Sequence, residues 1–461
     1  MRIKTGNPLT PALFGFLQDA VFLPITGIAS DSREILPGDL FLALPGEKTD
    51  GAAYVEEAFA RGATFVLSHR VSADQRVLTV PDPLSALFRA ASAYAGSIPH
   101  RTVAITGSYG KTTLRVALAS VLSSAFPVVC TEGNGNTDLA VALTLLSMTP
   151  GTAYLIAELG MRGPGEISLL SRLVKPDLSI ITAIGSAHVG RLGSIDAIRK
   201  AKCEIADGME PGGTLFYPAD DPLLTQEVEG LPVRACGVSC DPSVPGIYSL
   251  TEVSSAGGKP DVSFAGPEGT LARVILPSSD TPTLTAAAFC FAVCEKLGVD
   301  RSVTRKGLER LPSPPLRRQI ETVRGVKWIL DCYNASPEPT SAALRDLKKY
   351  AENGKRLFLV LGDMLELGNE ALTLHRAIGR QAAGLSPSRL ICVGETAHEY
   401  GVGANEAGLS KQNVETFSQD DLPALAAFLR KQTQPGDVVL IKGSRAIALE
   451  RLVPLFKQAD I

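Results

Sequence analysis

Cysteine is scarce in this sequence. Eight cysteines stand among 461 residues, too few for the disulfide framework of a small secreted domain, and they indicate a reducing compartment. Two pairs share a four-residue spacing, Cys236 with Cys240 and Cys290 with Cys294. Because neither pair has a Cys-x-x-Cys pattern or a nearby histidine, we expect buried thiols and no zinc site.

The sequence also lacks a long apolar run. No uninterrupted apolar segment approaches the roughly 18 residues of a membrane-spanning helix. The first 17 residues faintly resemble a signal peptide, but Pro8 and Pro11 interrupt them, Gln18-Asp19 follows, and no small-residue cleavage site appears. We therefore expect a cytoplasmic protein.

Neither sign of charge dominates the chain. The 45 lysines and arginines stand against 48 aspartates and glutamates, which gives a net charge of -3. No global field therefore attracts nucleic acid or an anionic membrane, and any basic site must be local. We expect a monomer with neither nucleic acid nor a membrane as its partner.

Length and composition predict about three domains. A chain of 461 residues, 45% hydrophobic and 20% charged, can bury several cores. Residues 1–98 alternate short strands and turns with a helix near 54–61, which is typical of a small α/β domain. Residues 99–312 contain a strand, a glycine loop and a helix, then strands at 153–157 and 178–183. That order predicts a parallel sheet, and the Pro-, Gly- and Ser-rich stretch between 239 and 269 predicts hairpins and loops at one side of it.

A proline cluster, Pro312-Ser313-Pro314-Pro315, marks the second predicted boundary. Beyond it, residues 313–461 alternate helical runs with strand-like runs at 327–330, 357–361, 390–393 and 437–441. This alternation predicts a second doubly wound sheet. The predicted fold class is α/β in three domains: a small first domain, a central parallel-sheet domain and a Rossmann-like last domain.

The most informative segment is Thr106-Gly107-Ser108-Tyr109-Gly110-Lys111-Thr112-Thr113. It lies between an apolar run at 102–105 and a helical pattern at 111–125. Closely spaced glycines between a strand and a helix present backbone N–H groups and the helix dipole to an anion, and Lys111 adds a positive charge. Thr112 then supplies a hydroxyl for Mg²⁺. The usual pattern G-x-x-x-x-G-K-[ST] is not fully met, because Ile105 stands five positions before Gly110. A plain turn is the alternative, but the flanking strand and helix favour a phosphate site.

Two polar residues follow strands of the same predicted sheet. Glu158 ends the run at 153–157, and His188 follows the run at 178–183 after a short loop. Because the carboxyl ends of parallel strands share an edge, both residues are candidates to face the phosphate loop. Glu158 is either a Mg²⁺ ligand or a surface glutamate. A histidine such as His188 more often hydrogen-bonds within its own loop.

The remaining charged candidates have ordinary interpretations when the residues are taken alone. Lys202, within Arg199-Lys200-Ala201-Lys202, is typical of the solvated face of a helix. Arg317 and Arg318 follow the proline cluster and fit simple surface charge. Asp331 closes the predicted strand at 327–330.

Five segments spread over the whole chain resemble the Mur ligase family. They are Asp31-Ser32-Arg33 with Pro37-Gly38-Asp39-Leu40-Phe41, Thr106 to Thr113, Glu132-Gly133-Asn134-Gly135-Asn136, Asp331-Cys332-Tyr333-Asn334-Ala335-Ser336-Pro337, and Gly362-Asp363-Met364-Leu365-Glu366-Leu367-Gly368 with Lys442-Gly443-Ser444-Arg445. The fourth and fifth segments resemble in particular the branch that joins D-alanyl-D-alanine to UDP-N-acetylmuramoyl-tripeptide. The sister ligase that adds the third amino acid, and folylpolyglutamate synthetase, more typically have Asp-Tyr-Ala-His in the fourth.

The resemblance implies an ATP-dependent, ADP-forming amide ligase of peptidoglycan precursor synthesis. The tripeptide carboxylate would attack the γ-phosphate of ATP, and the amine of D-alanyl-D-alanine would then displace phosphate from the acyl phosphate. ATP and two Mg²⁺ ions are the implied cofactors, and the UDP-tripeptide and the dipeptide are the implied substrates. Two alternatives stay open: a Mur-type or folylpolyglutamate-type ligase that adds a single amino acid, and a nucleotide-dependent binding switch without ligase activity.

The same resemblance implies roles for individual residues. Catalysis is implied for Lys111, His188, Lys202 and Arg317, with Arg318 as the alternative arginine. Contacts with ATP are implied for Thr106, Gly107, Ser108, Tyr109, Gly110, Lys111, Thr112, Thr113, Asn134, Arg317, Asp331 and Asn334. Metal ligation is implied for Thr112, Glu158, His188 and, if it is carbamylated, Lys202. Substrate binding is implied for Ser30, Asp31, Ser32, Arg33, Lys442, Ser444 and Arg445, with the first four near the UDP end.

One segment departs from the family pattern. Where the family usually has His-Asn-x-x-Asn at the start of a helix, this chain has Thr281-Pro282-Thr283-Leu284-Thr285. We therefore expect contacts with the nucleotide base to be absent or to come from other residues. Because the phosphate loop and Arg317 lie on opposite sides of the proline cluster, we also expect domain closure to assemble the site.

Overall fold

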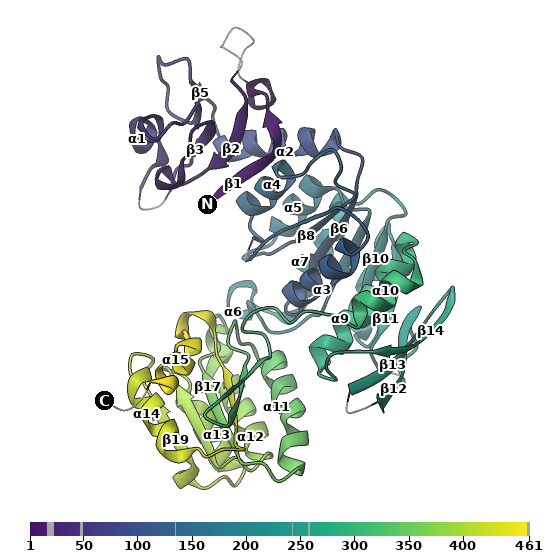
Figure 1. Ribbon diagram of the computed structural model, residues 1–461, viewed down its shortest axis with the longest axis vertical. Helices are drawn as coiled ribbons and strands as arrows, with labels where there is room; N and C mark the ends of the chain where they lie inside the picture. Colours follow the sequence, from purple (N-terminus) through teal and green to yellow (C-terminus); the bar gives the residue numbers. More distant parts are fainter. Residues whose placement is uncertain (16–22, 47–48, 134, 242, 257–258, 459–461) are drawn as a thin grey trace.

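The computed structural model describes residues 1–15, 23–46, 49–133, 135–241, 243–256 and 259–458. Three sheets follow one another along the chain, and Figure 1 shows the central sheet between the other two. The predicted three-domain α/β fold is confirmed. The boundaries near 98 and 312 stay proposals, although the strands of each sheet lie within the proposed ranges.

The first sheet has the strand order β1-β2-β3-β4-β5. Its elements are β1 (Arg2–Leu9), β2 (Ile25–Ala29), β3 (Asp39–Ala43), α1 (Val55–Ala60), β4 (Phe65–Ser68), β5 (Val77–Thr79) and α2 (Pro83–Gly96). β1 is antiparallel to β2, and the other pairs are parallel. The side chain of Asp82 caps α2 by accepting from Leu84 N–H. α2 packs against α4 (Asp138–Leu146) of the central part, which ties the first sheet to its neighbour.

The central sheet has nine strands in the order β14-β13-β12-β11-β10-β9-β6-β8-β7. The strands are β6 (Arg101–Thr106), β7 (Val128–Cys130), β8 (Tyr154–Glu158), β9 (Leu178–Ile181), β10 (Thr214–Pro218), β11 (Arg234–Ser239), β12 (Tyr248–Ala256), β13 (Lys259–Gly266) and β14 (Gly269–Ile275). The helices are α3 (Lys111–Ser123), α4, α5 (Glu166–Val174), α6 (Val189–Leu192), α7 (Ile195–Cys203), α8 (Pro222–Glu229), α9 (Thr281–Leu297) and α10 (Arg301–Leu308). The last three strands form the antiparallel hairpins expected between 239 and 269.

Fully buried residues explain why β6 lies inside this sheet. Val103, Ala104 and Ile105 are inaccessible to solvent, and β6 pairs in parallel with both β8 and β9. A strand covered on both faces has a continuous apolar run of this kind. The phosphate-loop segment therefore starts from the middle of a rigid sheet.

The last sheet has the order β15-β16-β20-β17-β18-β19. Its strands are β15 (Gln319–Val323), β16 (Val326–Leu330), β17 (Leu357–Gly362), β18 (Arg389–Val393), β19 (Val414–Phe417) and β20 (Val438–Lys442), and its helices are α11 (Pro337–Glu352), α12 (Ala371–Ala383), α13 (His398–Glu406), α14 (Leu422–Gln432) and α15 (Leu452–Lys457). The four predicted strands are present as parallel strands. β15 adds an antiparallel hairpin at one edge.

Seven strands were not predicted individually from the sequence: β1, β5, β7, β10, β11, β15 and β19. β7 has only three residues, and β19 has the mixed sequence Val-Glu-Thr-Phe with no fully buried residue. Short strands of this kind have little apolar periodicity of their own. Their neighbours in the sheet, rather than local sequence, decide their conformation.

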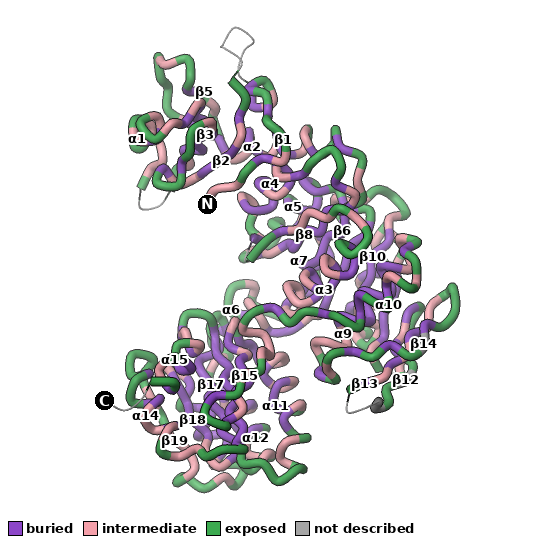
Figure 2. Tube along the Cα trace, in the orientation of Figure 1, coloured by how far each residue is buried: buried purple, intermediate pink, exposed green. Residues whose placement is uncertain are grey.

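Buried residues follow the three sheets, and exposed ones follow the outer helices and loops (Figure 2). All eight cysteines are free thiols, but Cys130 and Cys240 are only partly buried, so the expectation of buried thiols holds for six of them. Among the described residues, no helix combines the length and the apolar character needed to cross a membrane.

Candidate functional site

A cavity of about 570 Å³ lies between the central and last sheets. It is lined from one side by the phosphate loop, by Glu158 at the end of β8 and by Thr182 after β9. From the other side it is lined by Asp331 after β16 and by Lys442 at the end of β20. The carboxyl ends of parallel strands from two sheets therefore face each other, which is where ligands bind in open α/β folds.

The phosphate loop has the backbone that its glycines predict. Gly107 and Gly110 have φ angles of +143° and +83°, values that L-residues with side chains rarely adopt. A Cβ at Gly107 would lie 2.1 Å from Thr182 Oγ1, so only glycine fits. Lys111 begins α3, and its Nζ donates to Gly107 O at 2.6 Å. Burial lowers the pKa of Lys111, and Arg317 lowers it further, while Glu158 opposes the shift.

Glu158 is the centre of a buried hydrogen-bond network. Its Oε1 accepts from Thr112 Oγ1 and from Asn136 Nδ2, both at 3.2 Å, and its Oε2 accepts from Arg115 Nε at 3.1 Å. Glu158 is 3% exposed, so its interpretation as a surface glutamate is wrong. Arg115 also donates to Thr131 O. The carboxylate is thus fixed beside the phosphate loop, with Thr112 as a second oxygen donor.

Sequence reasoning missed Arg115 and Asn136, although both had a signal. Arg115 stands four residues after Lys111 on α3, a spacing that places both side chains on one helix face. Asn136 belongs to the segment 132–136 that carries the family resemblance, but the predicted ATP contact there was Asn134. Asn134 lies outside the described residues.

His188 lies where the central and last sheets meet. It has a φ angle of +69° at the start of α6, and its Nδ1 lies 2.6 Å from Glu366 Oε2. Arg191 Nη2 contacts the other oxygen of Glu366 at 3.1 Å. Burial lowers the pKa of His188, and Lys202 and Lys111 add to that shift, while Glu366 opposes it. Glu366 was part of a family segment but was not among the predicted site residues.

Lys202 is buried, which contradicts its interpretation as part of a solvated helix face. The residue is 1% exposed, whereas Lys200 on the same helix α7 is exposed and pairs with Asp196 at 3.1 Å. No hydrogen bond or ion pair of the Lys202 ammonium occurs among the described residues. Burial lowers its pKa well below 10.5, and Lys111 adds to that shift. The side chain is therefore buried close enough to Lys111 for the two charges to interact.

Arg317 reaches the phosphate loop from the last domain. Its Nη2 donates to Thr112 Oγ1 at 3.2 Å, and its guanidinium stacks over the Tyr333 ring at 4.2 Å. Leu316 and Arg318, on either side of it, have φ angles of +58° and +56°, and side chains disfavour that region. Burial lowers the pKa of Arg317. The segment after the proline cluster is thus bent so that Arg317 points at Thr112.

Arg318 points elsewhere. Its Nη1 pairs with Asp346 Oδ2 at 2.7 Å, and its Nε lies 3.9 Å from Asp331 Oδ2. Asp331 in turn accepts from Lys442 Nζ at 2.9 Å. Of the two candidate arginines, the structure therefore brings only Arg317 to the phosphate loop.

The other predicted residues of the last domain also reach the cavity. Asn334 is exposed, and its Oδ1 accepts from Ala335 N–H. Ser444 Oγ accepts from Leu365 N–H at 2.9 Å, and Arg445 pairs with Glu450. Among the described residues, the predicted site residues that line the cavity are Ser108, Tyr109, Gly110, Lys111, Thr112, Thr113, Glu158, His188, Arg317, Asp331, Asn334, Lys442, Ser444 and Arg445. Thr106, Gly107 and Lys202 lie behind this wall.

The segment that departs from the family pattern lies at one end of the same cavity. Asp280 caps α9 by accepting from Thr283 N–H at 2.9 Å. Thr281, Pro282 and Thr283 line the cavity together with apolar Phe289. This segment contributes hydroxyl groups and the apolar ring of Pro282 to the lining, in place of histidine and asparagine side chains.

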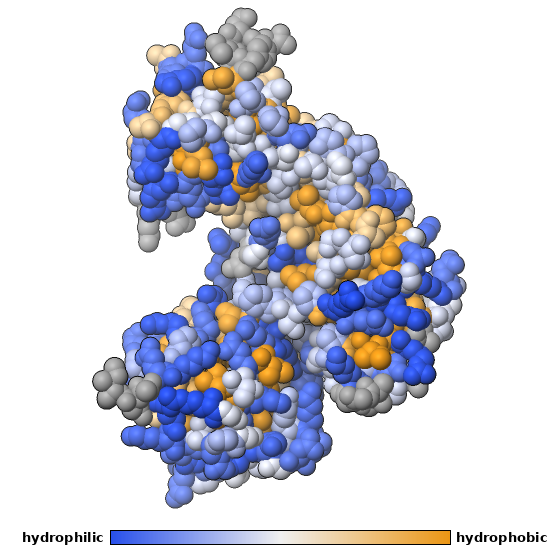
Figure 3. All heavy atoms as spheres, viewed as in Figure 1, coloured by the Kyte–Doolittle hydropathy of each residue, from blue (hydrophilic) through white to orange (hydrophobic). Residues whose placement is uncertain are grey.

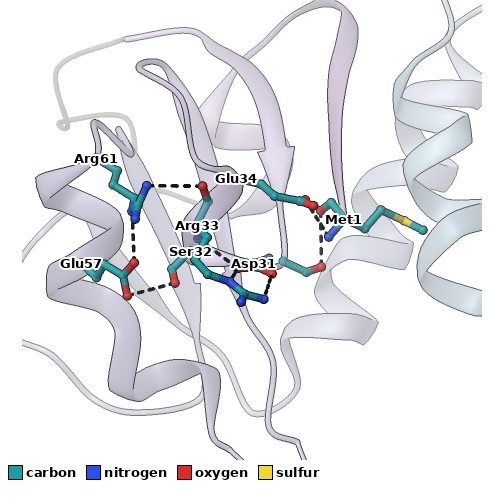
Figure 4. Close-up of polar contacts among 8 residues, drawn as sticks. Met1, Asp31, Ser32, Arg33, Glu34, Glu57 and Arg61 are labelled. Carbon is teal, nitrogen blue, oxygen red and sulfur yellow. Dashed lines mark hydrogen bonds and ion pairs between the residues drawn. The ribbon is translucent and has the colours of Figure 1, made fainter. Parts of the chain in front are cut away.

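None of the four predicted residues of the first domain lines the cavity. Figure 4 shows Asp31, Ser32 and Arg33 in a cluster of polar contacts of their own. Arg33 pairs with Asp31 through Nη2 and Oδ2 at 2.6 Å, which holds the pKa of Asp31 well below its usual range. Ser32 Oγ donates to Glu57 Oε2 at 3.2 Å, and Ser30 Oγ donates to Met1 O at 3.4 Å. These side chains come from the turn after β2 and form a separate polar cluster.

Metal ligands are sparse in the cavity. Within the described part of the chain, no three His, Cys, Asp or Glu side chains gather as a metal-binding group. Glu158 and Thr112 nevertheless offer the hard oxygen donors that Mg²⁺ prefers. A Mg²⁺ ion here would complete its coordination with water or phosphate oxygens, as it commonly does.

Three family models match successive parts of the chain. They are described as the Mur ligase family catalytic domain at residues 24–94, the Mur ligase middle domain at 105–255, and the Mur ligase glutamate ligase domain at 317–445. The matches follow the order of the three sheets.

Relatives match over almost the whole length. A protein of Bacillus subtilis named UDP-N-acetylmuramoyl-tripeptide--D-alanyl-D-alanine ligase is 34% identical and covers 93% of this chain and 92% of its own length. A crystal structure of MurF from Acinetobacter baumannii aligns with a TM-score of 0.87 at 28% identity, over 99% of this chain and all of that one. MurF from Thermotoga maritima, in complex with ADP, aligns with a TM-score of 0.83 at 26% identity, over 93% and 96%. With such coverage and identity, the chain belongs to the Mur ligase family.

Proposed function

We propose that this chain is the ATP-dependent, ADP-forming ligase that joins D-alanyl-D-alanine to UDP-N-acetylmuramoyl-tripeptide. The observation that carries the proposal is the meeting of two domains at Thr112, where the phosphate loop and Arg317 contact each other. Full-length relatives that bear this enzyme's name support the choice of substrates. The product is a peptidoglycan precursor, and we propose that the chain acts in the cytoplasm as a monomer with no nucleic acid or membrane partner.

The cavity suits phosphoryl transfer because it concentrates positive charge. The tripeptide carboxylate and the ATP γ-phosphate are both anions, so their approach needs cations that offset their repulsion. Lys111 and Arg317 supply two such cations from opposite walls. Burial lowers the pKa of each, and Glu158 opposes both shifts. A bound triphosphate would supply further negative charge.

Two Mg²⁺ ions belong to the proposal. Glu158 with Thr112 would hold one and His188 the other, and bound Mg²⁺ would supply further neutralisation of the phosphates. Asp331 and Lys442 form a pair that would face the nucleotide from the last domain. The apolar walls at Pro282 and Phe289 would accept the base.

A carbamate on Lys202 is a further part of the proposal. CO₂ adds to a neutral amine, and burial lowers the pKa of Lys202, which favours that form. The carbamate would turn a cation into an anion able to join a metal site beside Lys111. A buried lysine without a hydrogen-bond partner in the described structure is otherwise a cost to stability.

The UDP-N-acetylmuramoyl-tripeptide is a long substrate, so we propose that its binding site extends beyond the cavity. Figure 3 shows a hollow on one face of the molecule between the first and last domains. We propose that the UDP end lies near Ser30, Asp31, Ser32 and Arg33, and that the tripeptide runs along the central domain toward Lys111. Lys442, Ser444 and Arg445 would then contact the substrates where the two ends react. The domains are taken as 1–98, 99–312 and 313–461.

A phosphate-release assay with the complete UDP-tripeptide and ATP tests this function. Release that requires D-alanyl-D-alanine supports the proposal. Release with single amino acids or glutamate in place of the dipeptide would favour another Mur-type or folylpolyglutamate-type ligase. ATP binding without any peptide-dependent release would favour a binding switch.

A further inference from the structure

The loop between β9 and α6 touches both the phosphate loop and the last domain. On one side, Gly185 N–H donates to Ser108 Oγ at 3.0 Å, and Ser108 Oγ donates to Gly185 O at 3.2 Å. On the other side, Ser186 N–H donates to Glu338 Oε1 at 2.9 Å, and Ser186 Oγ donates to Glu338 Oε2 at 3.3 Å. Two adjacent residues thus connect the phosphate loop with Glu338, which lies in the first turn of α11.

The contact leaves no free space. A Cβ on Gly185 would lie 2.8 Å from Glu338 Cδ and 3.0 Å from Tyr109 Cε1. Burial raises the pKa of Tyr109 to about 12, and the charge of Glu338 contributes to that shift. Glu338 is therefore packed against the phosphate loop itself as well as bonded to the neighbouring loop.

A second contact joins the same two domains through backbone alone. Gly190 N–H donates to Glu366 O at 3.2 Å, and a Cβ on Gly190 would lie 2.6 Å from Gly368 N. A single point of contact would leave the last domain free to rotate about it. The bidentate contact of Glu338 with Ser186 supplies a separate point, in addition to the contacts of Glu366 with His188 and Arg191 and of Arg317 with Thr112.

We propose that Glu338 is a positioning residue that seats the last domain on the phosphate loop, so that Arg317 is held in line with the transferring phosphate. Glu338 is not among the residues that line the cavity, so it acts through the loop and not on the substrate. Its carboxylate suits the role because the N-terminus of its own helix favours an anion and because an ionised acceptor strengthens a hydrogen bond. The inference rests on the proposed function for its effect on rate, but not for the contact itself.

Glu338→Ala is expected to lower kcat of ligation about tenfold, because small misplacements of reacting groups are costly. The Kd for ADP should stay within about twofold, since the phosphate loop remains intact. Hydrogen exchange of the peptide that covers residues 184–189 should become faster, because the Ser186 amide loses its acceptor. Glu352→Ala is the matched control: Glu352 lies at the other end of α11, is exposed and pairs only loosely with Lys348, at 3.8 Å.

Unchanged exchange and unchanged kcat in Glu338→Ala would overturn the proposal. An equal loss of ADP affinity and kcat would also overturn it, because the residue would then act on nucleotide binding. If Glu338→Ala fails to fold, Glu338→Gln is the deciding variant, because its amide oxygen still accepts from Ser186. Exchange near the wild-type rate together with kcat of at least half the wild-type value would support the contact. A tenfold loss of kcat in Glu338→Gln would contradict it. The exchange measurement needs no activity, so a wild-type protein that does not ligate would refute the proposed function and leave this test standing.

Discussion

The cavity and the polar cluster of the first domain treat their charges in opposite ways. In the cavity, burial lowers the pKa of both Lys111 and Arg317. In the first-domain cluster, Arg33 has 78% of its side chain exposed and is matched by Asp31 at 2.6 Å. The charges of the first-domain cluster are therefore balanced by solvent and by an internal partner. In the cavity, Lys111 and Arg317 are both buried and share Glu158 as their nearby counter-charge.

This difference suggests that the cavity carries out the reaction, whereas the first-domain cluster binds substrate. Buried cations near one another destabilise the empty site and are stabilised when an anion arrives. Exposed and already paired charges gain little from a new partner, because solvent screens them. We therefore expect changes in the cavity to affect rate strongly, and changes in the first domain to affect mainly the affinity for the UDP-precursor.

The largest effect is expected for Lys111→Ala. Loss of the ammonium that faces the phosphates removes charge stabilisation from the transferring group, and we expect ADP formation to fall by about 10³-fold or more. The measurement is coupled-assay ADP production with the complete substrates. Binding of the UDP-precursor should persist, because its UDP end lies in the first domain. Ligation at the wild-type rate would remove the phosphate loop from the mechanism.

A smaller loss of rate with a gain in stability is expected for Lys202→Met. The rate should fall roughly 10- to 100-fold, as for residues that support a metal site. The pKa of Lys202 in the folded state lies below the unfolded value of 10.5. Between these two pKa values, the folded protein therefore binds fewer protons than the unfolded protein. The free energy of unfolding then decreases as pH falls through that range. Lys202→Met has no titrating group at this position and does not lose stability in this way. Its Tm at pH 7 should therefore exceed that of the wild type, and the difference in Tm should decrease toward pH 10.5.

Lys200→Met is the matched control for that variant. Lys200 lies on the same helix but is 64% exposed, so its replacement should change neither the rate nor the pH dependence of Tm. Added bicarbonate should raise the activity of the wild type and not that of Lys202→Met. A Tm for Lys202→Met below that of the wild type at pH 7 would contradict the lowering of the Lys202 pKa by burial.

The smallest effect is expected for Arg33→Ala. We expect KM for the UDP-precursor to rise roughly two- to fivefold with kcat and ADP affinity unchanged, as is usual for exposed charge pairs. Arg76→Ala is a close control, because Arg76 pairs with Asp74 in the same Asp-x-Arg geometry, also at 2.6 Å. A change in kcat for Arg33→Ala, or an equal rise of KM in Arg33→Ala and Arg76→Ala, would contradict the assignment of substrate binding to the first-domain cluster.

Much of the fold followed from the sequence, because the long buried strands have apolar patterns of their own. β6, β8 and β17 are such strands, and their ends position the phosphate loop, Glu158 and the segment after Gly362. Short strands such as β7 were missed because their conformation depends on neighbours distant in sequence. The Rossmann-like last domain was predicted from alternation alone, but its antiparallel strand β15 was not.

The site was predictable in its residue types and less so in its contacts. The family resemblance singled out Glu158 and Lys202, but their burial depends on how helices pack over the sheet. Asn136 and Glu366 lay in segments that had been recognised, yet no sequence pattern indicates that one donates to Glu158 or that the other meets His188. Contacts between domains, such as Arg317 with Thr112, join residues 205 positions apart and could not be derived from local sequence.

The most direct test of the central claim is mass analysis of the product formed from the UDP-tripeptide, D-alanyl-D-alanine and ATP. The account predicts a single UDP-linked product, heavier than the tripeptide by one dipeptide less one water, with one ADP formed for each product molecule. ADP formation without that product, or a product that carries a single added amino acid when single amino acids are offered alongside the dipeptide, would contradict it.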